Sequence, residues 1–319
     1  MSGCSQGESS TVTTTPPDLT TLIPVPTTVA ATTSAPQPAP TLPPPAPTGL
    51  CEAFVDPVAT GVIESERINE ASGIATSRTY PGTLWIHNDS GGGPFVHAAD
   101  RIGNDLGAFE IDAPAFDWED MAIGPGREPG LDYLYLGDIG DNFHFRPFVT
   151  IYRVAEPQPD PAGGTIAGVA TFDLVYPNPG FDSEAMLVDP VTGDLLLITK
   201  PRSGEAALVF RAPADELIDG ARINLSQVGS FPLAAGTFVT AADIDRTGAA
   251  IIFRGYNQVW LWARTDLGFT DTFAAEPCRT PSTAEVQGEA IAFAADGFSY
   301  YTISEGLSPD INFVESLLP

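Results

Sequence analysis

One hairpin pattern recurs along this sequence and restricts the folds that the chain can adopt. In its clearest copy, residues 183–200, a carboxylate opens a short apolar strand, a turn rich in Asp and Gly follows, and a second apolar strand returns. Residues 288–305 repeat the pattern, and looser copies begin at Glu70, Glu119 and Thr240. Short-stranded repeats of ~40–50 residues are typical of a radial array of antiparallel sheets.

The sequence therefore predicts an all-β protein, a β-propeller of antiparallel four-stranded blades. We count five blades; six is the alternative, because the Pro-rich stretch around 157–164 and the loop after Asp266 leave room for another. Four blades have four strands, whereas the last, ending with 311–315, has three. The strand at 59–68 has no hairpin partner of its own. We expect it to complete the last blade and close the ring, which removes an exposed sheet edge.

Two outer strands are placed by weaker patterns. The sequence predicts that residues 223–231 form one continuous outer strand of the third blade, and that the outer strand of the fourth blade lies near 272–275. Helical periodicity is nowhere sustained, and only 212–218 fits a single helical turn.

Composition divides the chain into two parts. Residues 5–49 are mostly Thr, Pro, Ser and Ala without periodicity, so they cannot bury enough surface to offset their ordering entropy. We expect residues 1–50 to be an N-terminus and disordered tether, and residues 51–319 to be one propeller domain. Cys4 follows two small residues, as in a bacterial lipoprotein cleavage motif, which predicts lipidation of Cys4. The expected location is extracytoplasmic, anchored to a bacterial membrane or secreted.

The charge of the chain limits its partners. A net charge of −27 repels phosphate backbones, so we expect no nucleic-acid partner. No apolar run is long enough for a transmembrane helix, so the only expected membrane contact is the lipid anchor. We expect a monomer. Cys51 and Cys278 remain once Cys4 is set aside, and an even pair in an exported protein suggests a disulfide.

Acidic residues at equivalent repeat positions predict a metal site. Because inner strands line the axis of a propeller, the carboxylates that open them should form a ring: Glu70, Glu119, Glu184 and Glu289, with Thr240 in the fourth blade. Converging carboxylates repel one another, and a bound Ca²⁺ would compensate. The alternative is that each Glu caps backbone amides or pairs with an arginine.

A second calcium motif lies at 137–142, where Gly alternates with Asp138, Asp141 and Asn142. Such alternation combines backbone bends with several side-chain oxygens. The alternative is a hairpin turn rich in Asp and Asn.

Residues that end the second strands should face the same mouth of the channel. The candidate ligand-binding residues are Asn88, Asp89, Lys200, Arg254 and Glu305, and the candidate catalytic residues are Glu184, Lys200, Arg254 and Glu305. The two cations suit a phosphate or carboxylate. We expect a small-molecule or polymer ligand there; a merely solvated rim is the alternative. No serine-hydrolase elbow, P-loop or dinucleotide fingerprint occurs.

The Glu-initiated hairpins at 182–186 and 287–291 resemble repeats of bacterial propellers, nearest to the esterase-like phytase domain within the TolB-like and gluconolactonase-like group. The resemblance covers residues 60–319 and implies a propeller that holds calcium in its channel. Two departures are the count of five blades, where that group usually has six, and Thr240 in place of Glu.

Together these features predict a surface-anchored or secreted propeller with an acidic, calcium-organised axial cleft. Whether it is an enzyme stays open; if so, we expect a metal-dependent hydrolase acting on an ester or phosphoester. The alternative is a non-catalytic propeller that binds a ligand or protein partner on the same face.

Overall fold

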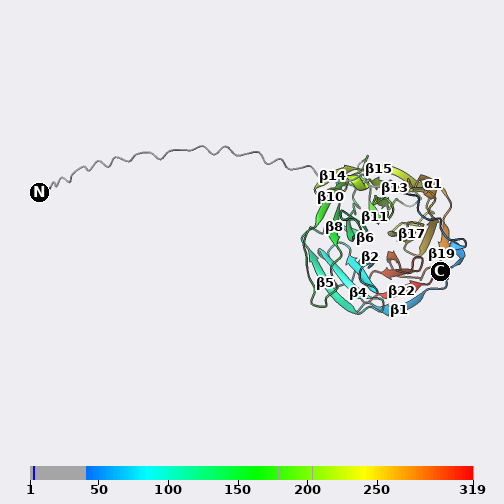
Figure 1. The fold of residues 1–319 in the computed structure, drawn as a ribbon, viewed down its shortest axis with the longest axis horizontal. Coiled ribbons are helices and arrows are strands. Elements are labelled where there is room, and N and C mark those ends of the chain that lie inside the picture. The colour runs from blue at the N-terminus through cyan, green and yellow to red at the C-terminus, as the bar shows by residue number, and fades with distance from the viewer. Residues whose placement is uncertain (1–2, 4–40, 179, 203, 319) are drawn as a thin grey trace. The chain divides into compact units, whose positions relative to one another are not determined.

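The computed structural model describes residue 3 and residues 41–178, 180–202 and 204–318. In residues 41–318, five sheets surround an axis and form a five-bladed β-propeller (Figure 1). Each blade starts with an inner strand and proceeds outward, so the labels β2, β6 and β11 lie nearer the centre of Figure 1 than β5 and β1. The predicted fold class and five-blade count are confirmed. The predicted lipidation residue, Cys4, and most of the predicted tether lie outside the described residues.

The first two blades are the largest sheets. Blade 1 contains β2 (Ala71–Thr76), β3 (Thr83–Asn88), β4 (Phe95–Asp100) and β5 (Asp105–Ile111), with β9 (Gly164–Ile166) parallel to β5. Blade 2 contains β6 (Trp118–Pro125), β7 (Asp132–Asp138), β8 (Val149–Ala155) and β10 (Ala170–Val175), with β14 (Ala221–Asn224) parallel to β10. Each extra strand therefore comes from a connection that reaches back to the preceding blade.

The remaining blades have four strands each. Blade 3 contains β11 (Ser183–Val188), β12 (Leu195–Thr199), β13 (Ala207–Ala212) and β15 (Ser226–Phe231). Blade 4 contains β16 (Ala241–Ile244), β17 (Ala250–Gly255), β18 (Gln258–Ala263) and β19 (Cys278–Thr280). Blade 5 contains β20 (Gly288–Phe293), β21 (Tyr300–Ser304), β22 (Asp310–Val314) and β1 (Val58–Val62). The short helical turns are η1 (Leu50–Glu52), η2 (Ala214–Glu216) and α1 (Thr270–Ala274).

The ring closes through the N-terminal strand, as the sequence predicted. β1 pairs antiparallel with β22, the last strand of the chain, so blade 5 gains its fourth strand from the opposite end of the propeller. The predicted disulfide also forms: Cys51, in η1, bonds to Cys278, which opens the outer strand of blade 4. Closure thus involves both backbone pairing and a covalent link.

Two predictions for outer strands were wrong. Residues 272–275 do not form a strand; they overlap α1, whose Phe273 packs into the core together with the N-cap residue Phe269. The outer strand of blade 4 is instead β19. The predicted strand at 223–231 is interrupted, because its first residues belong to β14 and pair with blade 2 rather than blade 3.

The hydrophobic core lies between blades rather than at one centre. Five clusters of buried side chains occur, one at each junction between neighbouring blades. Along β12, Leu195 and Leu197 pack toward blade 2, whereas Leu196 and Ile198 pack toward blade 4. Because this strand is buried on both faces, its sequence is continuously apolar instead of alternating, and each fully buried side chain contributes about 1.5–3 kcal/mol.

Polar contacts tie the inner strands together around the axis. The Asp120 Oδ2 atom accepts hydrogen bonds from the backbone amides of Met186 (2.8 Å) and Ala242 (3.1 Å), so one carboxyl group joins blades 2, 3 and 4. The Thr240 hydroxyl donates to the carbonyl oxygen of Gly288 at 2.9 Å and joins blades 4 and 5. These contacts fix the inner strands that position the residues of the mouth.

Candidate functional site

Bulges near the mouth occur at one residue in four of the five inner strands. The pairing between the first and second strands of a blade skips one residue in blades 1, 2, 3 and 5: Ser72, Glu119, Glu184 and Glu289. A bulge leaves its residue unpaired and re-aims its side chain, which is why bulges are common next to functional sites. Three of the four predicted ring acids therefore share one structural position.

The fourth predicted ring acid, Glu70, is not equivalent to the others. The bulged residue of blade 1 is Ser72, whose hydroxyl donates to the backbone carbonyl of Glu119 in the next blade. Glu70 lies two residues earlier and is exposed. The sequence pattern misaligned this strand because the motif Glu-Ala-Ser-Gly places its acid before the bulge. Blade 4 has no bulge here, in agreement with Thr240 replacing the acid.

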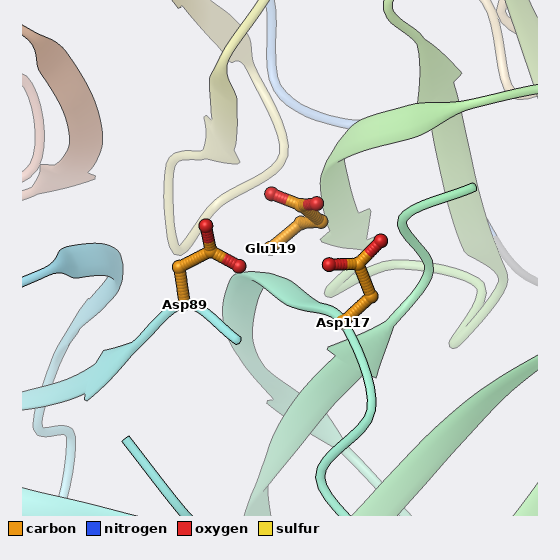
Figure 2. A group of neighbouring side chains, drawn as sticks. All are labelled: Asp89, Asp117 and Glu119. Carbon is orange, nitrogen blue, oxygen red and sulfur yellow. The ribbon is translucent and has the colours of Figure 1, made fainter. Parts of the chain in front are cut away.

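Three carboxylates converge at the mouth between blades 1 and 2. Asp89 follows β3, Asp117 precedes β6, and Glu119 occupies the bulge in β6; one oxygen from each lies within 4.8 Å of the others. Figure 2 shows these three side chains pointing toward one another, Asp89 from one segment and Asp117 and Glu119 from another. We call Asp89, Asp117 and Glu119 the acidic triad.

Glu119 is the most constrained member of the acidic triad. Glu119 is only 5% exposed, and no described residue donates a hydrogen bond to its carboxylate. Burial raises the pKa of Glu119 well above its usual value, and the charges of Glu184 and Asp89 raise it further. Burial, followed by the charges of Asp89 and Asp182, raises the pKa of Asp117 to about 6. The Arg146 charge counters the rise for Asp117, and the backbone amide of Ser90 donates to Asp89, so Glu119 is the member of the triad whose carboxylate has no donor among the described residues.

Gly140 provides the space that Glu119 and Asp117 occupy. A Cβ atom at this position would overlap with carboxylate oxygens of both residues. The conformation at Gly140 is not left-handed, so only this close approach requires glycine. Gly140 belongs to the motif at 137–142, whose function in the structure is to bring a loop against the acidic triad.

Asp138 and Asp141, which the sequence suggested as metal ligands, hold this loop in place. Asp138 forms an ion pair with Arg146 (2.8 Å) and accepts the backbone amide of Phe116 at 3.1 Å. Asp141 accepts the backbone amides of Phe145 and Arg146, each at 2.9 Å. Asn142 is exposed. We therefore leave these three residues out of the donor set that we propose below.

Blade 3 adds two acids and the only lysine of the chain to the mouth. Asp182 accepts the backbone amide of Asp141 at 2.7 Å, and burial raises its pKa. Glu184 forms an ion pair with Lys200, which also lies over the ring of Tyr256, 5.6 Å from its centre. Burial raises the pKa of Glu184, and the Lys200 ammonium counters that rise. The ammonium of Lys200 is thus paired with a carboxylate of its own blade.

Blade 5 supplies the remaining acids of the mouth. Burial raises the pKa of Glu289 to about 7, although Lys200 counters that rise. Burial also raises the pKa of Glu305, and the charges of Asp89 and Glu70 raise it further. These effects show that Glu305 lies in the field of the acids of blade 1. The mouth as a whole is strongly negative.

Two predicted ligand-binding residues are occupied by contacts within the fold. The side chain of Asn88 is buried; its amide nitrogen donates to the carbonyl of Arg67 at 2.6 Å. Arg254 is 2% exposed, pairs with Glu285, and donates to the carbonyl of Ala290 at 2.9 Å. Neither side chain is free for a ligand in this arrangement.

Sequence reasoning missed Asp117 and Asp182 as site residues. Each stands two positions before a bulged Glu, in the segments Asp-Trp-Glu and Asp-Ser-Glu. This shared spacing was the available signal: on an extended chain, residues two apart lie on one side of the strand. The repeat unit of the mouth is therefore a pair of acids in blades 2 and 3.

Comparisons with known proteins leave the family open. No family model matches the chain, and no curated protein matches it. Among solved structures, Raptor from Chaetomium thermophilum matches with a TM-score of 0.39 and 13% sequence identity, over 79% of this chain and 20% of that chain. The chain thus spans about a fifth of that protein. The five sheets around an axis, with the ring closed by β1, define this protein as a five-bladed β-propeller.

Proposed function

We propose that the acidic triad binds a divalent cation, Ca²⁺ by preference, and that this site holds an oxygen-bearing ligand at the mouth. The observation that carries the proposal is Glu119: a buried carboxylate with no donor among the described residues, beside two further carboxylates within 4.8 Å. Three carboxylates offer up to six oxygens, and Ca²⁺ takes six to eight, so water or ligand oxygens would complete the shell.

The alternative explanation, that an acid pairs with a cation within the fold, applies to other acids near the mouth but not to Glu119. Glu184 has Lys200, and Asp138 has Arg146. An unpaired buried carboxylate is expensive and normally takes up a proton or acquires a partner. Because Gly140 lets the carboxylates of Glu119 and Asp117 lie close together, a cation between them is the partner that we propose.

For activity, we propose hydrolysis of an ester, with a phosphoester as the less favoured linkage because uncompensated acids surround the triad. A bound cation would supply Lewis-acid polarisation of a ligand oxygen. Lys200 and Glu184 lie at the same mouth as a paired cation and acid, and Glu305 adds a second acid. The proposed activity agrees with the resemblance of the Glu-initiated hairpins to the esterase-like phytase, TolB-like and gluconolactonase-like group. A non-catalytic module that binds a ligand on this face is the alternative.

For location, we propose an exported protein that is anchored through lipid on Cys4 or secreted. The disulfide between Cys51 and Cys278 supports an oxidising compartment. No helix in the described part of the chain is long and apolar enough to cross a membrane.

The test is calorimetric titration of the metal-free protein with Ca²⁺, followed by an esterase and phosphatase panel with and without Ca²⁺. We expect one Ca²⁺ site in the wild type and its loss in Glu119→Gln. Glu110→Gln removes an exposed carboxylate on β5 and is the matched control, which should bind normally. A wild type that takes up no divalent cation would refute the proposal. Cation binding without any turnover would favour the binding module.

A further inference from the structure

Resting on the proposed function, we propose that the mouth binds a neutral carbohydrate that stacks on three exposed phenylalanine rings beside the acidic triad. We call these rings, Phe116, Phe143 and Phe145, the aromatic platform. The hydroxyl groups of the sugar would reach the cation and the carboxylates, while one apolar face of its ring would lie on the platform.

The aromatic platform is an unusual exposure of apolar surface. Phe116, Phe143 and Phe145 are 57%, 83% and 64% exposed. Their rings are in mutual contact: the centres of Phe116 and Phe145 lie 6.4 Å apart edge to face, and those of Phe143 and Phe145 lie 6.4 Å apart stacked. Single exposed apolar residues are ordinary, whereas a contiguous group marks an interaction site.

The fold holds the platform rigidly, although its rings contact water. Asp141 binds the backbone amide of Phe145, and Asp138 binds that of Phe116. Arg146 lies over the Phe116 ring, 5.1 Å from its centre, and donates to the carbonyl of Gly140 at 2.8 Å. Presenting rings from a fixed loop lowers the ordering cost of binding, as a preorganised ligand site requires.

The platform borders the acidic triad directly. Phe116 is the residue before Asp117, and the loop that carries Phe143 and Phe145 also contains Gly140, which packs against Asp117 and Glu119. A ligand on the rings therefore has carboxylate oxygens beside it. The motif at 137–142, whose acids support this loop, serves both parts of the site.

The charges of the mouth select the ligand class. Asp182, Glu289 and Glu305 add acids beyond the triad, whereas the ammonium of Lys200 is already paired with Glu184. One divalent ion cannot neutralise this set, so an anionic ligand would be repelled. A sugar is uncharged, donates hydroxyl hydrogens to carboxylates that can only accept, and offers hydroxyl oxygens to a hard cation.

The experiment measures binding of neutral hexasaccharides of glucose, mannose and xylose by calorimetry in Ca²⁺, for the wild type, the double variant Phe143→Ala/Phe145→Ala, and a control. Ile102→Ala is the control, because Ile102 is 59% exposed in the turn between β4 and β5, at the opposite end of that blade. We expect one hexasaccharide class to bind, an affinity at least tenfold weaker in the double variant, and no change in the control.

Ca²⁺ titration of the same proteins separates the two proposals. The double variant should bind Ca²⁺ like the wild type, because the platform supplies no ligand to the ion. Normal Ca²⁺ binding with no hexasaccharide binding would overturn the carbohydrate inference and leave the cation site standing. A wild-type protein that binds no Ca²⁺ would overturn the proposed function instead. Selective binding of ATP or of hexalysine, used as anionic and cationic probes, would also overturn the carbohydrate inference.

Discussion

At the scale of single residues, Gly140 shows how an absent side chain shapes the mouth. Its place against Glu119 and Asp117 leaves no room for a methyl group, yet its φ does not lie in the positive range that favours glycine. The residue therefore separates two effects that are usually linked, the geometry of the carboxylates and the stability of the loop.

We expect Gly140→Ala to weaken Ca²⁺ binding at least tenfold while the melting temperature of the metal-free protein changes little. The added methyl group must displace carboxylates of the acidic triad, whose charges stay the same. Gly164→Ala is the matched control, because a Cβ there would make only ordinary contact with Phe109, at 3.7 Å. Equal Ca²⁺ affinities in both variants would show that the space beside Gly140 is not part of the cation site.

Lys200 gives a second test at this scale. Its side chain is 20% exposed and that of Glu184 is 5% exposed, so Lys200→Met leaves a largely buried carboxylate without its cation. We expect a loss of about 1–3 kcal/mol in the free energy of unfolding. Adding Glu184→Gln should recover most of it, measured by urea denaturation. A double variant no more stable than Lys200→Met would rule out a stabilising role for the pair.

Asp243 links stability to pH. It is partly buried in β16, where its Oδ2 accepts the amide of Phe293 at 2.8 Å, and burial raises its pKa from 3.8 to about 7. An acid whose pKa is higher in the folded protein stabilises the fold at low pH, and this contribution declines as the pH rises from about 4 to about 7. Stability should therefore fall less in Asp243→Asn than in the wild type between pH 5 and pH 8, by urea denaturation. Identical changes would contradict this account.

At the scale of elements, the sequence predicted strands well where burial makes them continuously apolar. β12 is such a strand, because neighbouring blades cover both of its faces. α1 escaped detection, since a helix of five residues is too short for its periodicity to register. β14 escaped because pairing with blade 2 is a long-range choice that local sequence does not encode.

The sequence predicted only part of the site, because some of its residues are placed by strand pairing that local sequence does not encode. The acids that open β11 and β20 could be aligned, because their repeats match in length. The bulge that puts Ser72 rather than Glu70 in the equivalent position depends on pairing geometry. The acidic triad joins a loop after β3 with the start of β6, and only the packing of two blades brings these segments together.

At the scale of the whole molecule, closure depends on pairing between β1 and β22 and on the disulfide between Cys51 and Cys278. A protein that begins at Ile63 lacks both. We expect it to aggregate, because the edge of β22 is then unpaired. Full-length Cys51→Ser/Cys278→Ser is the control: it should stay monomeric and lose no more than about 5 kcal/mol of stability. Light scattering after size-exclusion chromatography measures the association state of both proteins, and urea denaturation measures the stability of the control. A monomeric truncated protein would argue against closure by β1.

The central claim is that the mouth of the propeller holds a divalent cation between blades 1 and 2. Its most direct test is anomalous diffraction from crystals grown with Ca²⁺ and then with Tb³⁺ in its place. We expect one strong peak bounded by Asp89, Asp117 and Glu119. A peak at Asp138, Asp141 and Asn142 instead, or no peak at the mouth at millimolar cation, would contradict it.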